Sequence, residues 1–292
     1  MKLPSIGFGC SPFRAGGRRV DLEAAVRAAL AAGYRLFDVA ELYGNERAVG
    51  RALRQPGTPA RGELFVVGKA WRTNFRPAAL RVACEGSLRR LGVDAFDLYL
   101  LHAAEAWRHL RPLLDAEETG WEELERRAIP RDAQGRPVAD DVPLAETWDA
   151  MRDLARRGLT GSIGVSNFEP ALIEALELDP PAANQIACSP YEPNGPTVEW
   201  CRSRGIGLIV HSPLSTAGLL AEPRLYRVAR RHRRSPAQVV LRWNLQRGLV
   251  PIPSSVDPGH IAENLRALDF ELDADDLTAV DSLDRRGRAE AR

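Results

Sequence analysis

The sequence has few cysteines, almost no net charge and no long apolar run. Its four cysteines, Cys10, Cys84, Cys188 and Cys201, form no C-x-x-C pair, and their spacing does not match a zinc site. Lys+Arg (40) and Asp+Glu (39) balance to a net charge of +1, which argues against a nucleic-acid partner. No segment has the apolar length of a membrane span or of a signal peptide. We therefore expect a cytoplasmic protein with reduced thiols and without a bound metal.

Two common nucleotide-binding motifs are also missing. The stretch GFGCSPFRAGG does not fit G-x-G-x-x-G, because Pro12 stands where the third glycine would be, and no P-loop occurs. This absence counts against a doubly wound open sheet, which is the alternative architecture for a chain of this pattern.

Short apolar runs alternate with helical patterns along the whole chain. Eight runs predict strands, at 5–9, 35–39, 64–67, 96–101, 162–165, 184–187, 206–210 and 249–252. Helical patterns occupy 21–32, 46–53, 77–92, 144–157, 196–204 and 235–247, and further helices begin near 170, 258 and 274. Eight strand–helix units predict an α/β fold of the (β/α)₈ TIM-barrel type, one domain over residues 1–292.

One stretch, 103–142, breaks this rhythm. It lies between the fourth strand and its helix, and it contains an amphipathic, charge-rich piece at 116–128. Long segments inside a compact domain are usually functional or disordered. Because it follows a strand, we expect this insertion on the C-terminal face of the barrel, where such folds keep their active sites.

Four polar residues stand at or just after predicted strand ends. Asp38 ends the second run, Tyr43 follows it, Lys69 follows the third and His102 follows the fourth. Each has an ordinary structural reading alone, as a turn residue, wall residue, surface charge or structural imidazole. Since the ends of parallel strands meet at one face, we predict that the four side chains converge there.

These residue types suit the reduction of a carbonyl group. Its oxygen gains negative charge when hydride reaches the carbon, so a proton donor and electropositive groups are needed. Tyr43 is the predicted donor, and Lys69 is expected to lower the pKa of the phenol. Asp38 would hold Lys69 charged and in place, and His102 would orient the carbonyl oxygen.

The motifs around these residues resemble those of the aldo-keto reductases. FDVAELYGNE and DLYLLH are similar to the family's segments after the second and fourth strands, and the likeness runs from LPSIGFG to the last helix. Asp38, Tyr43, Lys69 and His102 match the family's catalytic tetrad. The resemblance implies an NAD(P)H-dependent reductase of a small aldehyde or ketone.

The same resemblance implies residues that bind the nicotinamide. Ser166 and Asn167 in GVSNF, with Gln185 in NQI, match the group that holds the carboxamide, which needs both donors and acceptors. In LIVHSPLS, His211 stands where the family usually has an aromatic residue against the nicotinamide, and Ser212 follows it. Charge on His211 would make cofactor binding depend on pH.

The segment IPSSVDPGHIAENL resembles the loop that binds the adenosine phosphate. Ser254 and His260 stand where many members have Lys and Arg, which read the 2′-phosphate of NADP. Ser254, Ser255 and the start of the following helix still offer phosphate donors. Glu263 and Asn264 match the pair that faces adenine. We favour NADPH as cofactor, with NADH left open.

Phe8, Trp71 and the 103–142 insertion are predicted to shape the substrate pocket. We expect a monomer, with an oligomer left open. Two other functions fit the same barrel. One is a cofactor-binding or regulatory protein with little turnover, because fold alone does not decide function. The other is a metal-dependent lyase or isomerase, which would need more carboxylates and imidazoles at the strand ends than Asp38 and His102.

Overall fold

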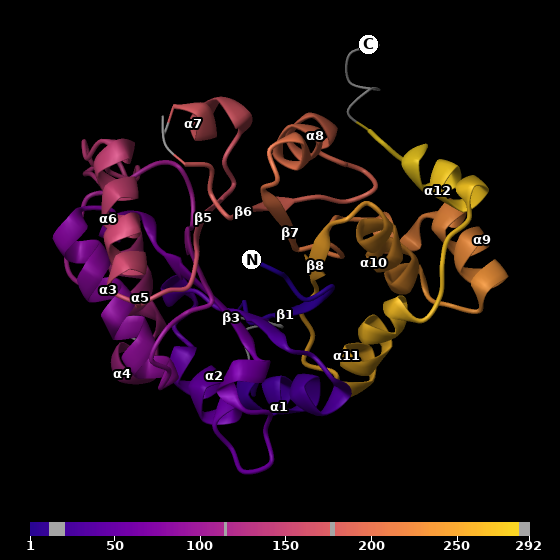
Figure 1. Ribbon diagram of the computed structural model, residues 1–292, viewed down its shortest axis with the longest axis horizontal. Helices are drawn as coiled ribbons and strands as arrows, with labels where there is room; N and C mark the ends of the chain where they lie inside the picture. Colours follow the sequence, from indigo (N-terminus) through magenta and orange to yellow (C-terminus); the bar gives the residue numbers. More distant parts are fainter. Residues whose placement is uncertain (12–20, 114–115, 176–178, 286–292) are drawn as a thin grey trace.

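The structure is a computed structural model that describes residues 1–11, 21–113, 116–175 and 179–285 (Figure 1). Eight parallel strands form one sheet in the order of the sequence, with helices around the outside. The strands are β1 (Gly7–Gly9), β2 (Leu36–Asp38), β3 (Phe65–Ala70), β4 (Leu98–Leu101), β5 (Ile163–Ser166), β6 (Ala183–Ala187), β7 (Gly207–His211) and β8 (Val250–Ile252). The predicted (β/α)₈ barrel is confirmed.

The first and last strands meet and close the barrel. The backbone N–H of Gly9 donates to the carbonyl of Pro253 at 3.1 Å, directly beyond the end of β8. Gly9 is needed at this seam, because a Cβ there would lie 2.6 Å from Ser254 Oγ and 2.8 Å from the Ile252 carbonyl oxygen. The seam therefore brings Ser254 next to the carboxyl end of β1.

Capping residues mark both ends of the first helix. In α1, the Asp21 side chain accepts from the N–H of Ala24, and Gly33 takes a φ of 113° after the last turn, as predicted. The helices are α1 (Leu22–Ala32), α2 (Glu46–Leu53), α3 (Pro77–Leu91), α4 (Ala116–Thr119), α5 (Trp121–Ala128), α6 (Leu144–Arg156), α7 (Pro170–Glu174), α8 (Gly195–Ser203), α9 (Pro223–His232), α10 (Pro236–Gln246), α11 (Pro258–Leu265) and α12 (Ala274–Asp281).

The core has two layers, because the strands are buried on both faces. A large cluster fills the space between the sheet and the helices, and includes Phe37, Val66 and Trp148. A smaller cluster fills the barrel interior; its members are Leu36, Val67, Leu98, Leu100, Ala183, Ile209, Val250 and Ile252. The candidate site lies directly above this interior cluster, at the carboxyl ends of the strands.

The 103–142 insertion is built into the barrel rather than left as a loose loop. It contains α4 and α5, apart from residues 114–115, which lie outside the described part. Trp107 forms an antiparallel bridge with Ala139, and its N–H donates to the carbonyl of Arg72 at 3.0 Å. Arg72 belongs to η3 (Arg72–Asn74), the turn that follows β3. The insertion is thus fixed beside the end of β3.

The structure differs from the sequence expectations at β3 and α9, and it does not describe Pro12. β3 continues to Ala70, so Lys69 lies within the strand and does not follow it. Helix α9 was not predicted. Pro12 lies outside the described residues. Along the described part of the chain, no helix combines the length and apolar character that crossing a membrane requires.

Candidate active site

Strand periodicity explains why polar side chains gather at one end of the barrel. Alternate residues of a strand face the same side, so the residue two positions after an interior apolar residue also points inward. Six candidate residues follow an interior residue in this way. The pairs are Leu36 and Asp38, Val67 and Lys69, Leu100 and His102, Ala183 and Gln185, Ile209 and His211, and Ile252 and Ser254.

Of these six candidate residues, all but Lys69 line a cavity of about 100 Å³ at the carboxyl ends of the strands. Its lining residues are Gly9, Ser11, Asp38, Tyr43, His102, Ser166, Asn167, Gln185, His211, Ser212, Ile252 and Ser254. Three of the predicted catalytic residues, Asp38, Tyr43 and His102, therefore share one cavity with the predicted nicotinamide residues and Ser254. Ser11 was missed by the sequence reasoning, although it is two positions beyond the inward-facing Gly9.

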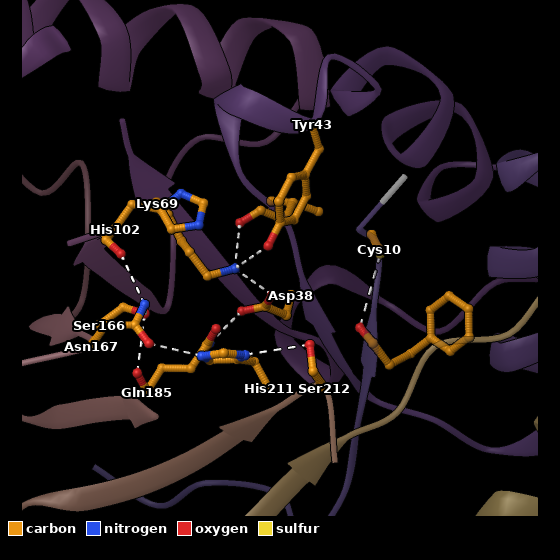
Figure 2. Close-up of polar contacts among 12 residues, drawn as sticks. Cys10, Asp38, Tyr43, Lys69, His102, Ser166, Asn167, Gln185, His211 and Ser212 are labelled. Atoms are coloured by element: carbon orange, nitrogen blue, oxygen red, sulfur yellow. Dashed lines mark hydrogen bonds and ion pairs between the residues drawn. The ribbon is translucent and has the colours of Figure 1, made fainter. Parts of the chain in front are cut away.

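Lys69 is the centre of the group of four predicted catalytic residues (Figure 2). Its side chain is fully buried and forms an ion pair with Asp38 Oδ1, while Nζ donates to Tyr43 Oη at 3.2 Å. The other carboxylate oxygen of Asp38 accepts from Gln185 Nε2 at 2.7 Å. Burial lowers the pKa of Lys69, but Asp38 and Tyr43 more than offset this and leave its pKa above the ordinary value. Lys69 is therefore an ammonium at neutral pH.

The pKa of Tyr43 differs from the sequence expectation. Burial of the phenol raises its pKa; Lys69 lowers it, but not enough to reverse the sign. The expected net lowering by Lys69 is therefore wrong. Tyr43 stays protonated at neutral pH, which is the form that can donate a proton, and the neighbouring ammonium stabilises the phenolate that donation would leave.

His102 lies against the same tyrosine. The two rings meet edge to face with their centroids 5.8 Å apart. Burial, followed by the charges of Lys69, His211 and Arg72, holds the pKa of His102 well below its ordinary value, so the ring is neutral. Its Nδ1 is buried and has no hydrogen-bond partner among the described residues. His102 can therefore act as a neutral hydrogen-bonding group beside the phenol.

A second network, made of amides and hydroxyls, forms the opposite wall. Asn167 Nδ2 donates to Ser166 Oγ at 3.1 Å, and Ser166 Oγ donates to the Gln185 carbonyl at 3.1 Å. His211 Nε2 lies 2.9 Å from Asn167 Oδ1, and Nδ1 lies 3.4 Å from Ser212 Oγ (Figure 2). Burial and Lys69 lower the pKa of His211, so it is neutral near pH 7 and gains charge only in acid.

This wall fits the nicotinamide end of a cofactor. Its carboxamide and hydroxyl groups supply both donors and acceptors, as a carboxamide ligand requires. Asn167 (φ 60°) and Ser212 (φ 52°) hold left-handed backbone conformations, which non-glycine residues adopt at a cost and which concentrate at binding sites. Gln185 departs from expectation in one respect, because its amide N–H₂ is already bonded to Asp38.

The predicted phosphate and adenine residues lie along the path from the cavity to α11. Ser254 lines the cavity, and Ser255 accepts from the N–H of Asp257 at 3.1 Å. Asp257 caps α11 by accepting from the N–H of His260 at 2.9 Å. Farther along the helix, the Glu263 side chain is half-buried and Asn264 is buried. At this helix start Pro258 has no N–H, and the N–H groups of Asp257 and His260 already donate within the loop. A phosphate there would therefore depend on the serine hydroxyls, and the carboxylate of Asp257 would oppose it.

The two predicted pocket residues have different positions. Trp71 packs edge-on against His102, with ring centroids 5.0 Å apart, and Trp107 of the insertion packs against Trp71 at 5.6 Å. Phe8 faces the helices: it contacts Tyr34 and Phe37 in the outer core. The expectation that Phe8 shapes the pocket is corrected, because it lies between the inward-facing Gly7 and Gly9.

Glu41 and Asn74 were missed by the sequence reasoning. Both are buried behind Trp71 and are bonded to each other. The signal that could have found Glu41 is an acidic residue inside FDVAELYGNE, two positions before Tyr43. Among the described residues, no group of three or more His, Cys, Asp or Glu has the spacing to hold a metal ion.

Comparison with known proteins gives a consistent result. Residues 5–285 match the model of the aldo/keto reductase family. The chain is 35% identical to dihydrodiol dehydrogenase 3 of Bos taurus, with 98% of this chain and 90% of that protein covered. It is 34% identical to prostaglandin-E(2) 9-reductase of Oryctolagus cuniculus over the same shares. The solved aldose reductase of Schistosoma japonicum superposes with a TM-score of 0.86 at 34% identity, over 98% of this chain and 91% of that one.

Proposed function

The chain belongs to the aldo/keto reductase family and is thereby an oxidoreductase, and we propose that it reduces an aldehyde or ketone with a nicotinamide cofactor and with Tyr43 as the proton donor. The observation that carries this proposal is the position of Lys69. Its ammonium contacts both the Asp38 carboxylate and the Tyr43 hydroxyl inside a buried site. An ammonium held in this way stabilises a phenolate, which is the species left when the phenol gives up its proton.

The proposed reaction forms an alcohol. The reduced nicotinamide, when bound, supplies a hydride to the carbonyl carbon. Tyr43 gives its hydroxyl proton to the carbonyl oxygen, and the resulting phenolate stays bonded to Lys69 until a proton returns from solvent. Asp38 keeps Lys69 charged and is itself held by Gln185. His102, neutral and beside the phenol, would donate a hydrogen bond that orients the oxygen of the substrate.

The amide wall would bind the cofactor's carboxamide. Ser166, Asn167 and Gln185 would hold it, and His211 with Ser212 would cover the nicotinamide face. Ser254, Ser255 and the start of α11 would bind the phosphates, with Glu263 and Asn264 toward adenine. We propose NADPH as the preferred cofactor, because the hydroxyls of Ser254 and Ser255 and the side chain of His260 can contact an additional phosphate. Asp257 opposes this preference, so NADH remains the competing cofactor.

The decisive test replaces Tyr43 with Phe. We expect Tyr43→Phe to lower kcat for a neutral aromatic aldehyde, such as 4-nitrobenzaldehyde, by about 10²- to 10⁴-fold, which is the usual contribution of a positioned acid. Cofactor oxidation measures turnover, and quenching of tryptophan fluorescence measures NADPH and NADH binding. Tyr226→Phe, which removes the hydroxyl of an exposed tyrosine, is the matched control and should keep wild-type turnover.

Two results would contradict the proposal. Turnover that survives in Tyr43→Phe would show that another group donates the proton. Cofactor binding by the wild type without turnover of any aldehyde or ketone would instead favour a cofactor-binding or regulatory barrel.

A further inference from the structure

A buried glutamate lies behind the catalytic tyrosine, and the proposed reaction does not use it. Glu41 begins the short turn η1 (Glu41–Tyr43), which carries Tyr43, and its side chain is only 2% exposed. Its Oε1 accepts from the backbone N–H of Trp71, and Oε2 accepts from Asn74 Nδ2 at 2.9 Å. A single carboxylate therefore joins the turn of the proton donor to the segment that follows β3.

The orientation of Asn74 is fixed from its other side. His109 Nδ1 lies 2.9 Å from the Thr73 carbonyl oxygen and 3.1 Å from Asn74 Oδ1. Since both of these partners are acceptors, Nδ1 must carry a proton and donate. The amide oxygen of Asn74 thus faces His109, and its N–H₂ faces Glu41. Glu41 therefore accepts from two groups that can only donate in this arrangement, the backbone N–H of Trp71 and the N–H₂ of Asn74. Two donors suit an ionised carboxylate.

The segment held by Glu41 is the wall next to His102. Trp71 and Trp107, which we call the tryptophan wall, pack against each other, and Trp71 packs edge-on against His102. On its far side, Trp71 Nε1 donates to the Ala128 carbonyl of α5 at 2.7 Å. The indole is therefore held at two points, by Glu41 through its backbone and by the insertion through its ring.

Charged groups around Glu41 shift its pKa in opposite directions. Glu46 of α2 faces it and disfavours a second negative charge, while Arg90 of α3 favours it. Arg90 Nε is bonded to Glu46 at 2.7 Å, so its charge is shared between the two carboxylates. Among the described residues, Cys84 of α3 and Tyr99 of β4 also face Glu41.

We propose that Glu41 is a positioning residue: its carboxylate sets the place of Trp71, and through Trp71 the substrate-side wall beside His102. The kinetic expression of this inference rests on the proposed reductase function, whereas the position of Trp71 does not. The ionised form holds both the Trp71 N–H and the Asn74 amide. Protonation weakens both hydrogen bonds, because a neutral carboxyl group is the poorer acceptor. The wall is then less firmly placed, and the substrate binds more weakly.

Glu41 changes its protonation state near neutral pH. Burial raises the pKa of Glu41 to about 7, against the lowering effects of the Trp71 N–H and Asn74 hydrogen bonds. Above this pH the carboxylate is ionised and the wall is held; below it the carboxyl is neutral. Substrate KM should therefore rise as pH falls through about 7.

The test compares wild type with Glu41→Gln, which keeps the size of the side chain but cannot titrate. Its amide oxygen serves one donor, and its N–H₂ faces the other, so one hydrogen bond is lost. With NADPH and 4-nitrobenzaldehyde at pH 8, we expect KM to rise about five-fold, as one lost hydrogen bond implies. We expect kcat and NADPH affinity to stay within about two-fold, and KM to become independent of pH near 7.

Two further variants make the comparison specific. Asn74→Ala removes one of the two donors and should raise KM in the same direction, with an effect that is not additive with Glu41→Gln. Glu105→Gln is the matched control: Glu105 accepts from the side chains of Arg72 and Trp107 on the same wall but is solvent-exposed. It should retain the step in KM near pH 7. An unchanged KM, or a persistent pH step in Glu41→Gln, would overturn the proposal.

Fluorescence gives a readout that needs no turnover. The contribution of Trp71 to the fluorescence is obtained by subtracting the emission spectrum of Trp71→Phe from that of wild type. We expect this difference to change with a midpoint near pH 7, and to be flat when both proteins also carry Glu41→Gln. A flat wild-type difference refutes the positioning of Trp71 by Glu41. If no aldehyde is turned over but the fluorescence step is present, the proposed function fails while the inference about Glu41 stands.

Discussion

The two ends of the proposed cofactor and substrate site hold charge in opposite ways. At the carboxyl ends of β2 and β3, Asp38 and Lys69 are buried and bonded to each other. At the start of α11, Asp257 and His260 are exposed, and no Lys or Arg occurs between Ser254 and Asn264. Buried paired charges are costly to change, because removing one partner leaves the other unpaired in a medium of low dielectric. On the proposed function, the residues of the chemical step are therefore fixed by the strands, whereas the residues that would set cofactor preference lie in an exposed loop, where substitutions cost little stability.

The largest expected effect comes from breaking the buried pair. Lys69→Met removes the ammonium from Tyr43 and leaves Asp38 held only by Gln185. We expect kcat for an aromatic aldehyde to fall by about 10²- to 10⁴-fold while NADPH affinity changes little. Lys2→Met, at an exposed position, is the matched control. Retention of more than about a tenth of kcat would show that the cation does not support the proton donor.

A second effect concerns stability at the buried end. Because the pKa of Glu41 is raised to about 7 from an ordinary value of 4.5, the folded state binds its proton more tightly than the unfolded state. This contribution is complete below pH 4.5 and is lost as pH rises through 7. We expect the free energy of unfolding of wild type, relative to Glu41→Gln, to fall by about 3 kcal/mol across that range. Urea unfolding at several pH values measures it, and a constant difference would contradict the shift.

A third, smaller effect tests the exposed end. Ser254→Lys with His260→Arg would place two cations in the loop before α11 and in its first turn. We expect NADPH to bind about ten-fold more tightly at low salt, with the gain reduced by salt because the site is exposed. NADH affinity should stay nearly constant and serves as the internal control. Equal gains for both cofactors would show that the new cations contact the shared pyrophosphate instead.

The smallest effect isolates one negative charge. Asp257→Asn keeps a side chain that caps α11 well but removes the carboxylate beside the helix start. We expect NADPH to bind about two-fold more tightly and the thermal midpoint to change little. Weaker binding would mean that Asp257 organises the loop for the phosphate rather than repelling it.

Much of the barrel could be predicted from the sequence, because each element carries its own local signal. The runs that became β2 and β4 are apolar and short, and α1 is bounded by Asp21 and Gly33, whose capping functions are local. The candidate catalytic residues were placed together because they stand at or just after strand ends. Helix α9 was not predicted because its ten residues include several arginines, which interrupt the apolar pattern formed by Leu225, Val228 and Ala229.

The remaining features depend on contacts between distant segments. Phe8 was misplaced because the strand's two faces cannot be distinguished until Gly7 and Gly9 are seen to face inward. The pKa of Tyr43 was misjudged because sequence shows its charged neighbour, Lys69, but not the burial that outweighs it. Glu41 was missed because its two partners lie 30 and 33 positions away along the chain.

The burial of Lys69 has a practical consequence for handling this protein. Lys2 and Lys69 are the only lysines in the sequence, whose other basic side chains, among 40 Lys+Arg, are arginines. Lys69 is 1% exposed, whereas Lys2 is exposed near the amino terminus. Reagents that acylate lysine side chains therefore meet just one accessible lysine, Lys2. A dye or a solid support coupled to lysine therefore attaches at Lys2 and leaves the buried Lys69 ammonium untouched.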